Sequence, residues 1–196
     1  MKKYKDFQIN SSLGNYELVF TEIGELINWQ PGGDFLIVDS FLKGKIKESN
    51  QSNIFWIKSN EKAKSFTELN KIFIALKLAK LSKDSILYAI GGGVVQDIAT
   101  FVSSLYMRGI NWNYIPTTFL GMTDSCIGGT SSINIDSYKN LIGNFYPPKK
   151  IILISSFTKS LPFIELIGGL VESAKISFCK GKISFKNYLK LTEPIL

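Results

Sequence analysis

Short apolar segments recur along the chain up to residue 154, and each is rich in β-branched or aromatic residues. Runs of four or five such residues between polar stretches are typical of strands buried in a sheet. The segments are residues 35–39 (FLIVD), 53–57 (NIFWI), 86–90 (ILYAI), 112–115 (WNYI) and 151–154 (IILI).

Two stretches between these segments have a helical pattern instead. In residues 66–79 and 94–105 the apolar positions recur every three or four residues, which lines one face of a helix. Strands that alternate with helices favour a parallel sheet, because parallel neighbours need a crossover and a helix supplies it. We therefore predict an α/β fold, a Rossmann-like parallel sheet with flanking helices.

The pattern changes at Leu161. The run LPFIELIGGLVESAKISF begins with Pro162, which suits the first turn of a helix, and continues apolar without strand alternation. About two helices' worth of chain follows, which is too little for an independent core. We expect an α/β domain over residues 1–158 and the truncated start of an all-helical second domain over 159–196.

The amino-acid composition argues against several classes of binding partner. Lys and Arg number 23 against 16 acidic residues, a net charge of +7, but the lysines are scattered and do not form a basic stripe interleaved with aromatics. No apolar run approaches the roughly 18 residues of a membrane span. Cys126 and Cys179 form no CxxC pair. We expect a cytoplasmic protein that binds neither nucleic acid nor membrane.

Histidine is absent from the whole sequence. This removes the commonest general base and the commonest metal ligand from any mechanism confined to this chain. Ser-His and Cys-His nucleophile schemes are excluded, and imidazole ligands for zinc would have to come from another chain.

A glycine run follows the strand of residues 86–90 and precedes a helical pattern. Gly91, Gly92 and Gly93 allow a sharp turn and a close backbone approach, and free N–H groups at a helix start attract anions such as a pyrophosphate. The run is not the GxGxxG fingerprint, so a phosphate cradle and a plain tight turn both fit. Asp97 lies inside the first helical turns, where a carboxylate can also complement the helix dipole.

Several polar residues outside the glycine run are candidates too. Asp39 ends the first strand, where open α/β sheets present groups to ligand hydroxyls, although it can equally be a turn residue. The polar connection from Thr117 to Asn140 is predicted to be functional, because long loops inside compact domains are usually either functional or disordered. Other candidates are the neighbours Lys139 and Asn140, which suit an anion, and Glu165, Glu172 and Lys175 on one face of the last helix, where Glu172 and Lys175 can equally form a surface ion pair. On composition alone, Glu61 and Lys64 are expected to be a solvated first-turn pair.

Four blocks together resemble 3-dehydroquinate synthase and its sugar-phosphate cyclase relatives. They are GGGVVQDIATFVSSLYMRG (91–109), IPTTFLGMTDSCIGG (115–129), KNLIGNFYPP (139–148) and SLPFIELIGGLVESAK (160–175), in the same order and at the same spacings as in that family. The resemblance covers residues 61 to about 178, and more loosely the first sixty.

The resemblance assigns roles position by position. It implies NAD contacts from Asp39, Glu61, Lys64, Gly92, Gly93, Asp97, Thr117, Thr118, Phe157, Ser160, Leu161 and Glu165. It implies a substrate site lined by Arg108, Asp124, Lys139, Asn140 and Lys175, with Glu172 as a ligand to zinc or cobalt. Arg108 in such enzymes reaches across a dimer interface, so the resemblance also implies a homodimer.

The chemistry implied is an NAD-dependent cycle on a seven-carbon sugar phosphate in the shikimate pathway. A ring hydroxyl is oxidised, phosphate is eliminated, the ketone is reduced again, and ring opening with aldol closure gives a carbocycle. Oxidation acidifies the neighbouring C–H, the metal polarises oxygen, and cationic residues hold the phosphate until it leaves.

The sequence departs from the family at two places. Thr130 replaces a lysine that engages the anionic substrate, and losing such a charge-assisted contact costs about 1.5–3 kcal/mol. Ile135 stands where a histidine is usual, and residues 136–138 replace a proline-containing turn. The second departure is truncation, since the family's helical domain carries the two zinc histidines.

We therefore expect this chain alone to bind NAD weakly or not at all and to be inactive without a complementing C-terminal chain. A fragment, a split enzyme and a decayed copy all fit that expectation. A sedoheptulose 7-phosphate cyclase and a noncatalytic NAD-binding remnant are the alternatives. A polyol or iron-alcohol dehydrogenase fits the four blocks less well.

Overall fold

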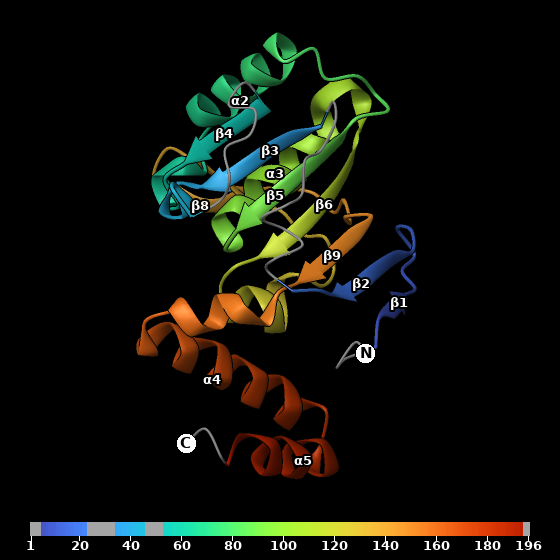
Figure 1. Cartoon of the computed structure of the whole chain (residues 1–196), viewed down its shortest axis with the longest axis vertical. Coiled ribbons are helices and arrows are strands. Elements are labelled where there is room, and N and C mark those ends of the chain that lie inside the picture. Colours follow the sequence, from blue (N-terminus) through green and yellow to red (C-terminus); the bar gives the residue numbers. More distant parts are fainter. Residues whose placement is uncertain (1–4, 23–33, 46–52, 194–196) are drawn as a thin grey trace.

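A seven-stranded sheet forms the centre of the computed structural model, which describes residues 5–22, 34–45 and 53–193. Its strands lie in the order β1-β2-β9-β6-β5-β3-β4 (Figure 1). All neighbours are parallel except the edge pair β1 and β2. The strands are β1 (Phe7–Ile9), β2 (Tyr16–Phe20), β3 (Phe35–Asp39), β4 (Ile54–Ile57), β5 (Ile86–Gly91), β6 (Asn111–Pro116) and β9 (Lys150–Leu153).

The five predicted strands are confirmed as β3, β4, β5, β6 and β9, with no end shifted by more than one residue. The edge strands β1 and β2 were not predicted. In β2 only Tyr16 is fully buried, and β1 is mostly exposed, so neither carries the continuous apolar pattern of a buried strand. The pairing of β2 with β9 defines it as a strand, and this pairing is not visible in local sequence.

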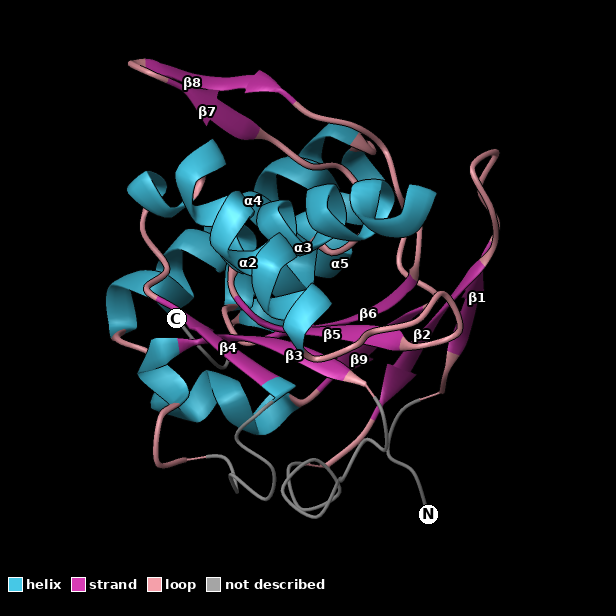
Figure 2. Ribbon diagram, turned by 90° about the horizontal axis from the view of Figure 1, so that it is seen from above, coloured by secondary structure: helices cyan, strands magenta, loops and turns pink. Residues whose placement is uncertain are grey.

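Helices α2 (Phe66–Leu78) and α3 (Gly93–Leu105) cover one face of the sheet, as Figure 2 shows. Ile72 on α2 and Ile98 on α3 are completely buried and share a core cluster with Ile37 and Leu87 of the sheet. A smaller cluster on the opposite face packs around Val38. The predicted α/β fold with a parallel sheet and flanking helices is confirmed.

The connection after β6 has more structure than its polar sequence suggests. It contains a π-helical turn, η5 (Gly121–Ser125), and a hairpin of β7 (Ile133–Ile135) and β8 (Tyr138–Ile142). The hairpin forms a separate two-stranded sheet that projects beyond α2 (Figure 2). Only Ile133 in it is fully buried, which explains why apolar periodicity did not reveal it.

Short 3-10 segments connect larger elements within the described ranges, among them η1 (Ser40–Leu42), η3 (Glu61–Ala63), η4 (Tyr106–Arg108) and η6 (Ser155–Ser160). The chain then forms α4 (Phe163–Cys179), directly after Pro162, and α5 (Lys182–Thr192). The predicted change to helical structure after Leu161 is therefore seen. No helix in the described ranges is long and apolar enough to cross a membrane.

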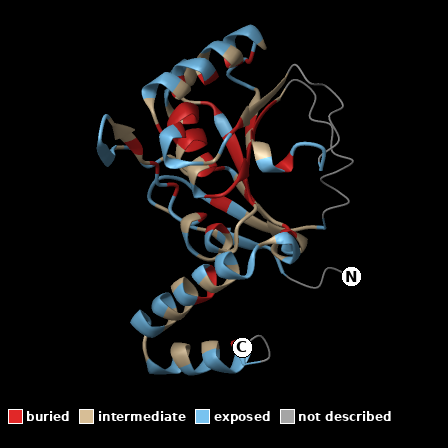
Figure 3. Ribbon diagram, turned by 90° about the vertical axis from the view of Figure 1, so that its left-hand side faces the viewer, coloured by how far each residue is buried: buried red, intermediate tan, exposed pale blue. Residues whose placement is uncertain are grey.

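Helices α4 and α5 pair with each other and extend from the sheet domain (Figure 1). Tyr188 donates a hydrogen bond to the Leu170 carbonyl at 2.7 Å, and Phe185 contacts Phe178 edge to face. Most of their surface is exposed, as the pale ribbon in Figure 3 shows, and it includes Phe163 and Ile183, which are 73% and 80% exposed.

Candidate functional site

The glycine turn lies between β5 and α3, at the carboxyl edge of the parallel strands. A Cβ on Gly91 would lie 2.5 Å from Val95 Cγ2, and one on Gly92 would lie 2.9 Å from Thr118 Cγ2, so both positions require glycine for close packing. Gly93 differs, because a Cβ there would meet nothing within 4 Å. The start of α3 is therefore tightly supported on one side and open at Gly93.

Hydrogen bonds from β6 hold the glycine turn in place. The amide of Thr117 donates to the Gly91 carbonyl at 3.0 Å, and the buried Tyr114 hydroxyl donates to the same oxygen at 3.2 Å. Thr118 Oγ1 accepts from the Gly121 amide at 3.1 Å and so begins the turn of η5. The predicted site residues Thr117 and Thr118 thus lie beside the predicted glycines. Tyr114 was not predicted, because a tyrosine in a buried strand looks like any core residue.

Lys64 forms a buried ion pair with Asp97 on α3. The two charged groups lie 2.8 Å apart, and the lysine side chain is only 4% exposed. The Lys64 ammonium also donates to Ser132 Oγ at 3.0 Å and to Asn140 Oδ1 at 2.6 Å. Burying an ammonium is costly unless it is paired and hydrogen-bonded, and here it is both. Three predicted residues that are distant in sequence therefore meet at one point.

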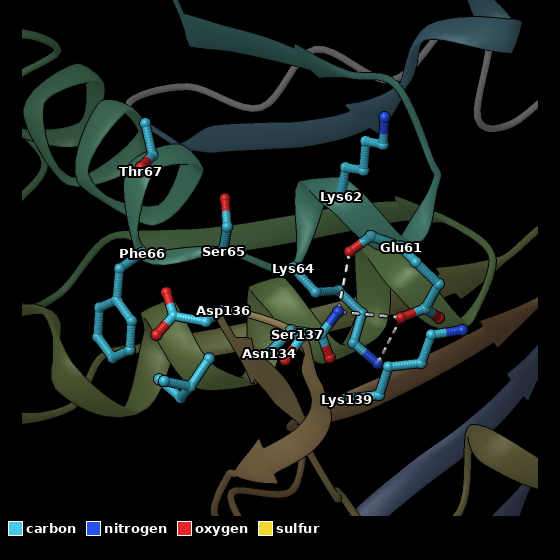
Figure 4. A pocket seen from close by; sticks show the side chains of 11 residues that line it. Glu61, Lys62, Lys64, Ser65, Phe66, Thr67, Asn134, Asp136, Ser137 and Lys139 are labelled. Carbon is cyan, nitrogen blue, oxygen red and sulfur yellow. Dashed lines mark hydrogen bonds and ion pairs between the residues drawn. The ribbon is translucent and has the colours of Figure 1, made fainter.

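Asn134 ties the β7–β8 hairpin to η3. Its amide group donates to the Glu61 carbonyl at 3.0 Å and to the Glu61 carboxylate at 3.1 Å. Its own Oδ1 accepts from the Asn140 amide at 2.8 Å, and its backbone N–H donates to the Lys64 carbonyl at 2.8 Å. A cavity of about 480 Å³ lies between the hairpin and the start of α2, and Glu61, Lys64 and Lys139 line it (Figure 4).

Asp39 caps the short helix η1 by accepting from the Phe41 amide at 3.0 Å through Oδ1. Asp39 is therefore a turn residue at the carboxyl end of β3, which is one of its two interpretations from the sequence. Two other predicted residues close the end of η6. Ser160 Oγ donates to the Phe157 carbonyl at 3.0 Å, and the Leu161 amide donates to the Thr158 carbonyl at 3.3 Å.

Helix α4 packs against the η5 turn through Gly169. A Cβ on Gly169 would lie 2.5 Å from Phe119 Cδ1 and 2.9 Å from the Leu120 amide nitrogen, so this glycine allows helix packing. The space beside Gly169 is therefore filled by the segment before η5 and leaves no room for a ligand. A Cβ on Gly168 would meet nothing within 4 Å, so this position is open. Figure 1 shows β5 and β6 pointing toward the end of the molecule where α4 lies.

Glu172 and Lys175 form an ion pair on α4. The hydrogen bond that Lys175 donates to the Glu172 carboxylate is the main cause that raises the pKa of Lys175, and the charge of Asp124 contributes to the same shift. Asp124 lies on η5, and this turn packs against α4, the helix that carries the pair. Glu165 lies exposed in the first turn of α4. Arg108 does not join them, because it follows α3 and precedes β6 and so lies at the amino edge of the sheet.

The residues present do not complete a metal site. Within the described ranges no group of three or more His, Cys, Asp or Glu side chains could hold a metal ion. The carboxylate of Glu172 pairs with Lys175, and a catalytic zinc needs three protein ligands. The chemistry of this chain's own donors therefore does not fit a resident zinc or cobalt.

Ser132 was not predicted as a site residue. Its backbone N–H and its hydroxyl both reach the Asp97 carboxylate, at 3.0 and 2.9 Å. A serine in a Thr-Ser-Ser run carries no local signal of such a contact. Only the placement of the hairpin against α3 reveals it.

Two solved synthase structures share this α/β fold. A structure of 2-deoxy-scyllo-inosose synthase complexed with carbaglucose-6-phosphate, NAD⁺ and Co²⁺ aligns with a TM-score of 0.73 at 23% identity, over 85% of this chain and 50% of that one. The 2-epi-5-epi-valiolone synthase ValA of Streptomyces hygroscopicus, with NAD⁺ and Zn²⁺ bound, aligns at 0.74 and 23%, over 87% and 52%.

Sequence comparison is more specific. The family model of the 3-dehydroquinate synthase N-terminal region matches residues 54–167, and this chain belongs to that family. The 3-dehydroquinate synthase of Dictyoglomus thermophilum is 39% identical over 165 residues, which are 83% of this chain and 46% of the relative. That of Prochlorococcus marinus subsp. pastoris is 38% identical over 146 residues, 74% and 40%. The chain spans less than half the length of these relatives.

Replacing Lys64 by Met should destabilise the fold strongly. Asp97 would lose its ion-pair partner while remaining largely buried, which costs about 3 kcal/mol in comparable cases. Lys62→Met is the matched control, because Lys62 is exposed and lies on the same 3-10 turn, and it should change the free energy of unfolding by less than about 0.5 kcal/mol. Urea unfolding measures both, and equal midpoints for the two variants would contradict the role of the ion pair.

The two cysteines should differ sharply in reactivity. Burial raises the pKa of the Cys126 thiol to about 12, so this thiol stays neutral at pH 8, whereas Cys179 is exposed. An aromatic disulfide reagent should label Cys179 in the native protein and Cys126 only after unfolding. Because the folded pKa of Cys126 is raised, its contribution to stability is complete below pH 9 and is lost as pH rises toward 12. Rapid native labelling of both thiols would disprove this assignment.

Proposed function

We propose that this chain is the NAD-binding half of a 3-dehydroquinate synthase, an enzyme that cyclises a seven-carbon sugar phosphate with elimination of phosphate. Residues 1–158 would form the cofactor domain, and 159–196 would begin a helical domain for substrate and metal. The observation that carries the proposal is the family match over residues 54–167 combined with the open helix start at Gly93.

The dinucleotide's diphosphate would bind at the amino terminus of α3. Backbone N–H groups at a helix start point at an anion, and the helix dipole adds a favourable partial charge. The open position of Gly93 and the neighbouring Thr118 support this placement. Asp39, at the end of β3, would accept from a ribose hydroxyl through its second carboxylate oxygen. The remaining cofactor contacts would come from Glu61, Lys64, Asp97, Thr117, Phe157, Ser160, Leu161 and Glu165.

The anionic substrate would lie between the hairpin and α4. Lys139 and Asn140 would hold it from the hairpin, and Asp124 and Lys175 would face it from η5 and α4. Cationic side chains stabilise the phosphate group while it leaves, and fixed positions lower the entropic cost of reaction. Bound NAD would supply hydride transfer.

Other parts of the active site would come from further chains. Arg108 lies at the opposite edge of the sheet, so it would serve the site of a second copy in a homodimer. The metal ligands besides Glu172 would come from a complementing helical segment. Exposed apolar residues on α4 and α5 support such a partner: Phe163, Ile164, Val171, Phe178, Ile183 and Leu191.

A cyclase for a sugar phosphate without a carboxylate is the second candidate. Thr130 supplies a neutral hydroxyl where the family lysine would place a charge, and Thr130 pairs through its backbone with Phe145 in an exposed loop. A substrate with fewer anionic groups, such as sedoheptulose 7-phosphate, would lose less from this change. The structural neighbour complexed with carbaglucose-6-phosphate belongs to this wider class.

NAD binding tests the cofactor half of the proposal. Gly93→Asp should weaken NAD binding at least about tenfold relative to Gly93→Asn, because the two side chains match in size and only the carboxylate repels a diphosphate. Both side chains project into open space, so the fold should survive, whereas Gly92→Asp would collide with Thr118. Isothermal calorimetry on wild type and the three variants measures the effect. Equal heats from the Asp and Asn variants would remove the glycine cradle from the proposal.

Turnover tests the reaction itself. The chain alone should release no phosphate, and mixing it with the C-terminal half of the Dictyoglomus relative, NAD and zinc should start phosphate release. With the seven-carbon sugar phosphate that carries a carboxylate, Thr130→Lys should raise kcat/KM by about tenfold, because the lysine would add one charge-assisted hydrogen bond to the substrate. Thr130→Met should not raise it. With sedoheptulose 7-phosphate the gain should be smaller. No release from either substrate, while NAD still binds, would favour a noncatalytic NAD-binding protein.

A further inference from the structure

Ser132 contacts the Asp97 carboxylate through two donors. Its backbone N–H donates to Oδ1 at 3.0 Å and its hydroxyl donates to Oδ2 at 2.9 Å. Asp97 lies on α3, one turn after the glycine run, while Ser132 precedes the first strand of the hairpin. The contact therefore joins the base of the hairpin to the helix that begins at the glycine turn.

The same hydroxyl accepts a hydrogen bond from Lys64. An ammonium has three N–H donors, and those of Lys64 go to Asp97, Ser132 and Asn140, at 2.8, 3.0 and 2.6 Å. Lys64 as a whole is only 3% exposed, so water cannot replace a lost partner easily. Removing the hydroxyl would leave one buried donor of Lys64 without its acceptor.

We propose that Ser132 is a positioning residue that fixes the β7–β8 hairpin to α3. Through Lys64 and Asp97 its hydroxyl sets the place of Asn140 and of its neighbour Lys139 relative to the glycine turn. The hydroxyl lies within hydrogen-bond distance of residues on three segments: Lys64 after η3, Asp97 on α3 and Asn140 on β8. The consequence for ligand binding rests on the proposed function, whereas the consequence for the hairpin does not.

The hairpin offers a matched control in Ser137. This serine lies in the turn between β7 and β8, is exposed, and its hydroxyl has no hydrogen-bond partner within the part of the chain that the structure describes. Figure 4 shows it beside Asn134, on the hairpin that Ser132 would fix. Ser137→Ala therefore removes a hydroxyl from the same element without removing a contact.

Amide hydrogen exchange measures the fixing directly. The reporters are the backbone amides of Asn134 and Asn140, which donate to the Lys64 carbonyl and to Asn134 Oδ1, each at 2.8 Å. Ser132→Ala should raise their exchange rates by about tenfold, the effect of losing one hydrogen bond to a charged group. Ser132→Thr keeps the hydroxyl and should restore the wild-type rates. Ser137→Ala should leave them unchanged.

In the exchange experiment, three results would overturn the proposal: equal hairpin exchange in wild type and Ser132→Ala, failure of Ser132→Thr to restore it, or an equal rise at the buried amides of α2, which would indicate global destabilisation. Calorimetry with NAD on the same proteins should show weaker binding for Ser132→Ala, with Ser132→Thr as rescue. Equal affinities would also overturn the positioning role. Absence of NAD binding in wild type even with the complementing C-terminal half present would count against the proposed function, and hydrogen exchange would still decide the role of Ser132.

Discussion

The buried ammonium of Lys64 is the constraint on which the candidate site depends. A charge that is almost completely shielded from water must be neutralised and hydrogen-bonded, and Asp97, Ser132 and Asn140 together meet that requirement. Asp97 lies on α3, whereas Ser132 and Asn140 belong to the base and the second strand of the β7–β8 hairpin. Satisfying one side chain therefore brings η3, α3 and the β7–β8 hairpin together, and this places Lys139 and Asn140 near the carboxyl edge of the sheet.

Close packing at two glycines fixes the part of the site between the glycine turn and α4. Gly92 lies against Thr118, and Gly169 on α4 lies against Phe119, so the segment after β6 is held between the glycine turn and the last long helix. Neither glycine has a positive φ, so both are required by contact and not by backbone conformation. Gly93 alone among the three consecutive glycines faces open space, and the proposed diphosphate site depends on this difference.

A single chain brings some of the predicted catalytic residues close together but leaves Arg108 apart from them. Glu172 and Lys175 form an ion pair on α4, which packs on the η5 turn that carries Asp124, whereas Arg108 lies beyond the amino end of β6. Exposed apolar side chains on α4 and α5 leave a surface that a helical partner could cover. This arrangement agrees with a chain that spans less than half the length of its relatives.

The sequence by itself determined the parallel sheet, its two covering helices, the change to helical structure after Leu161 and the family. Buried strands such as residues 35–39 and amphipathic helices such as residues 66–78 express their burial in local periodicity. The tertiary structure decided what periodicity does not encode: the edge strands β1 and β2, the exposed hairpin, the packing role of Gly169 and the contacts of Ser132. These features depend on pairing between residues far apart in the chain, such as Lys64 with Asp97 and Asn140. A residue's own neighbours in sequence carry no record of such pairing.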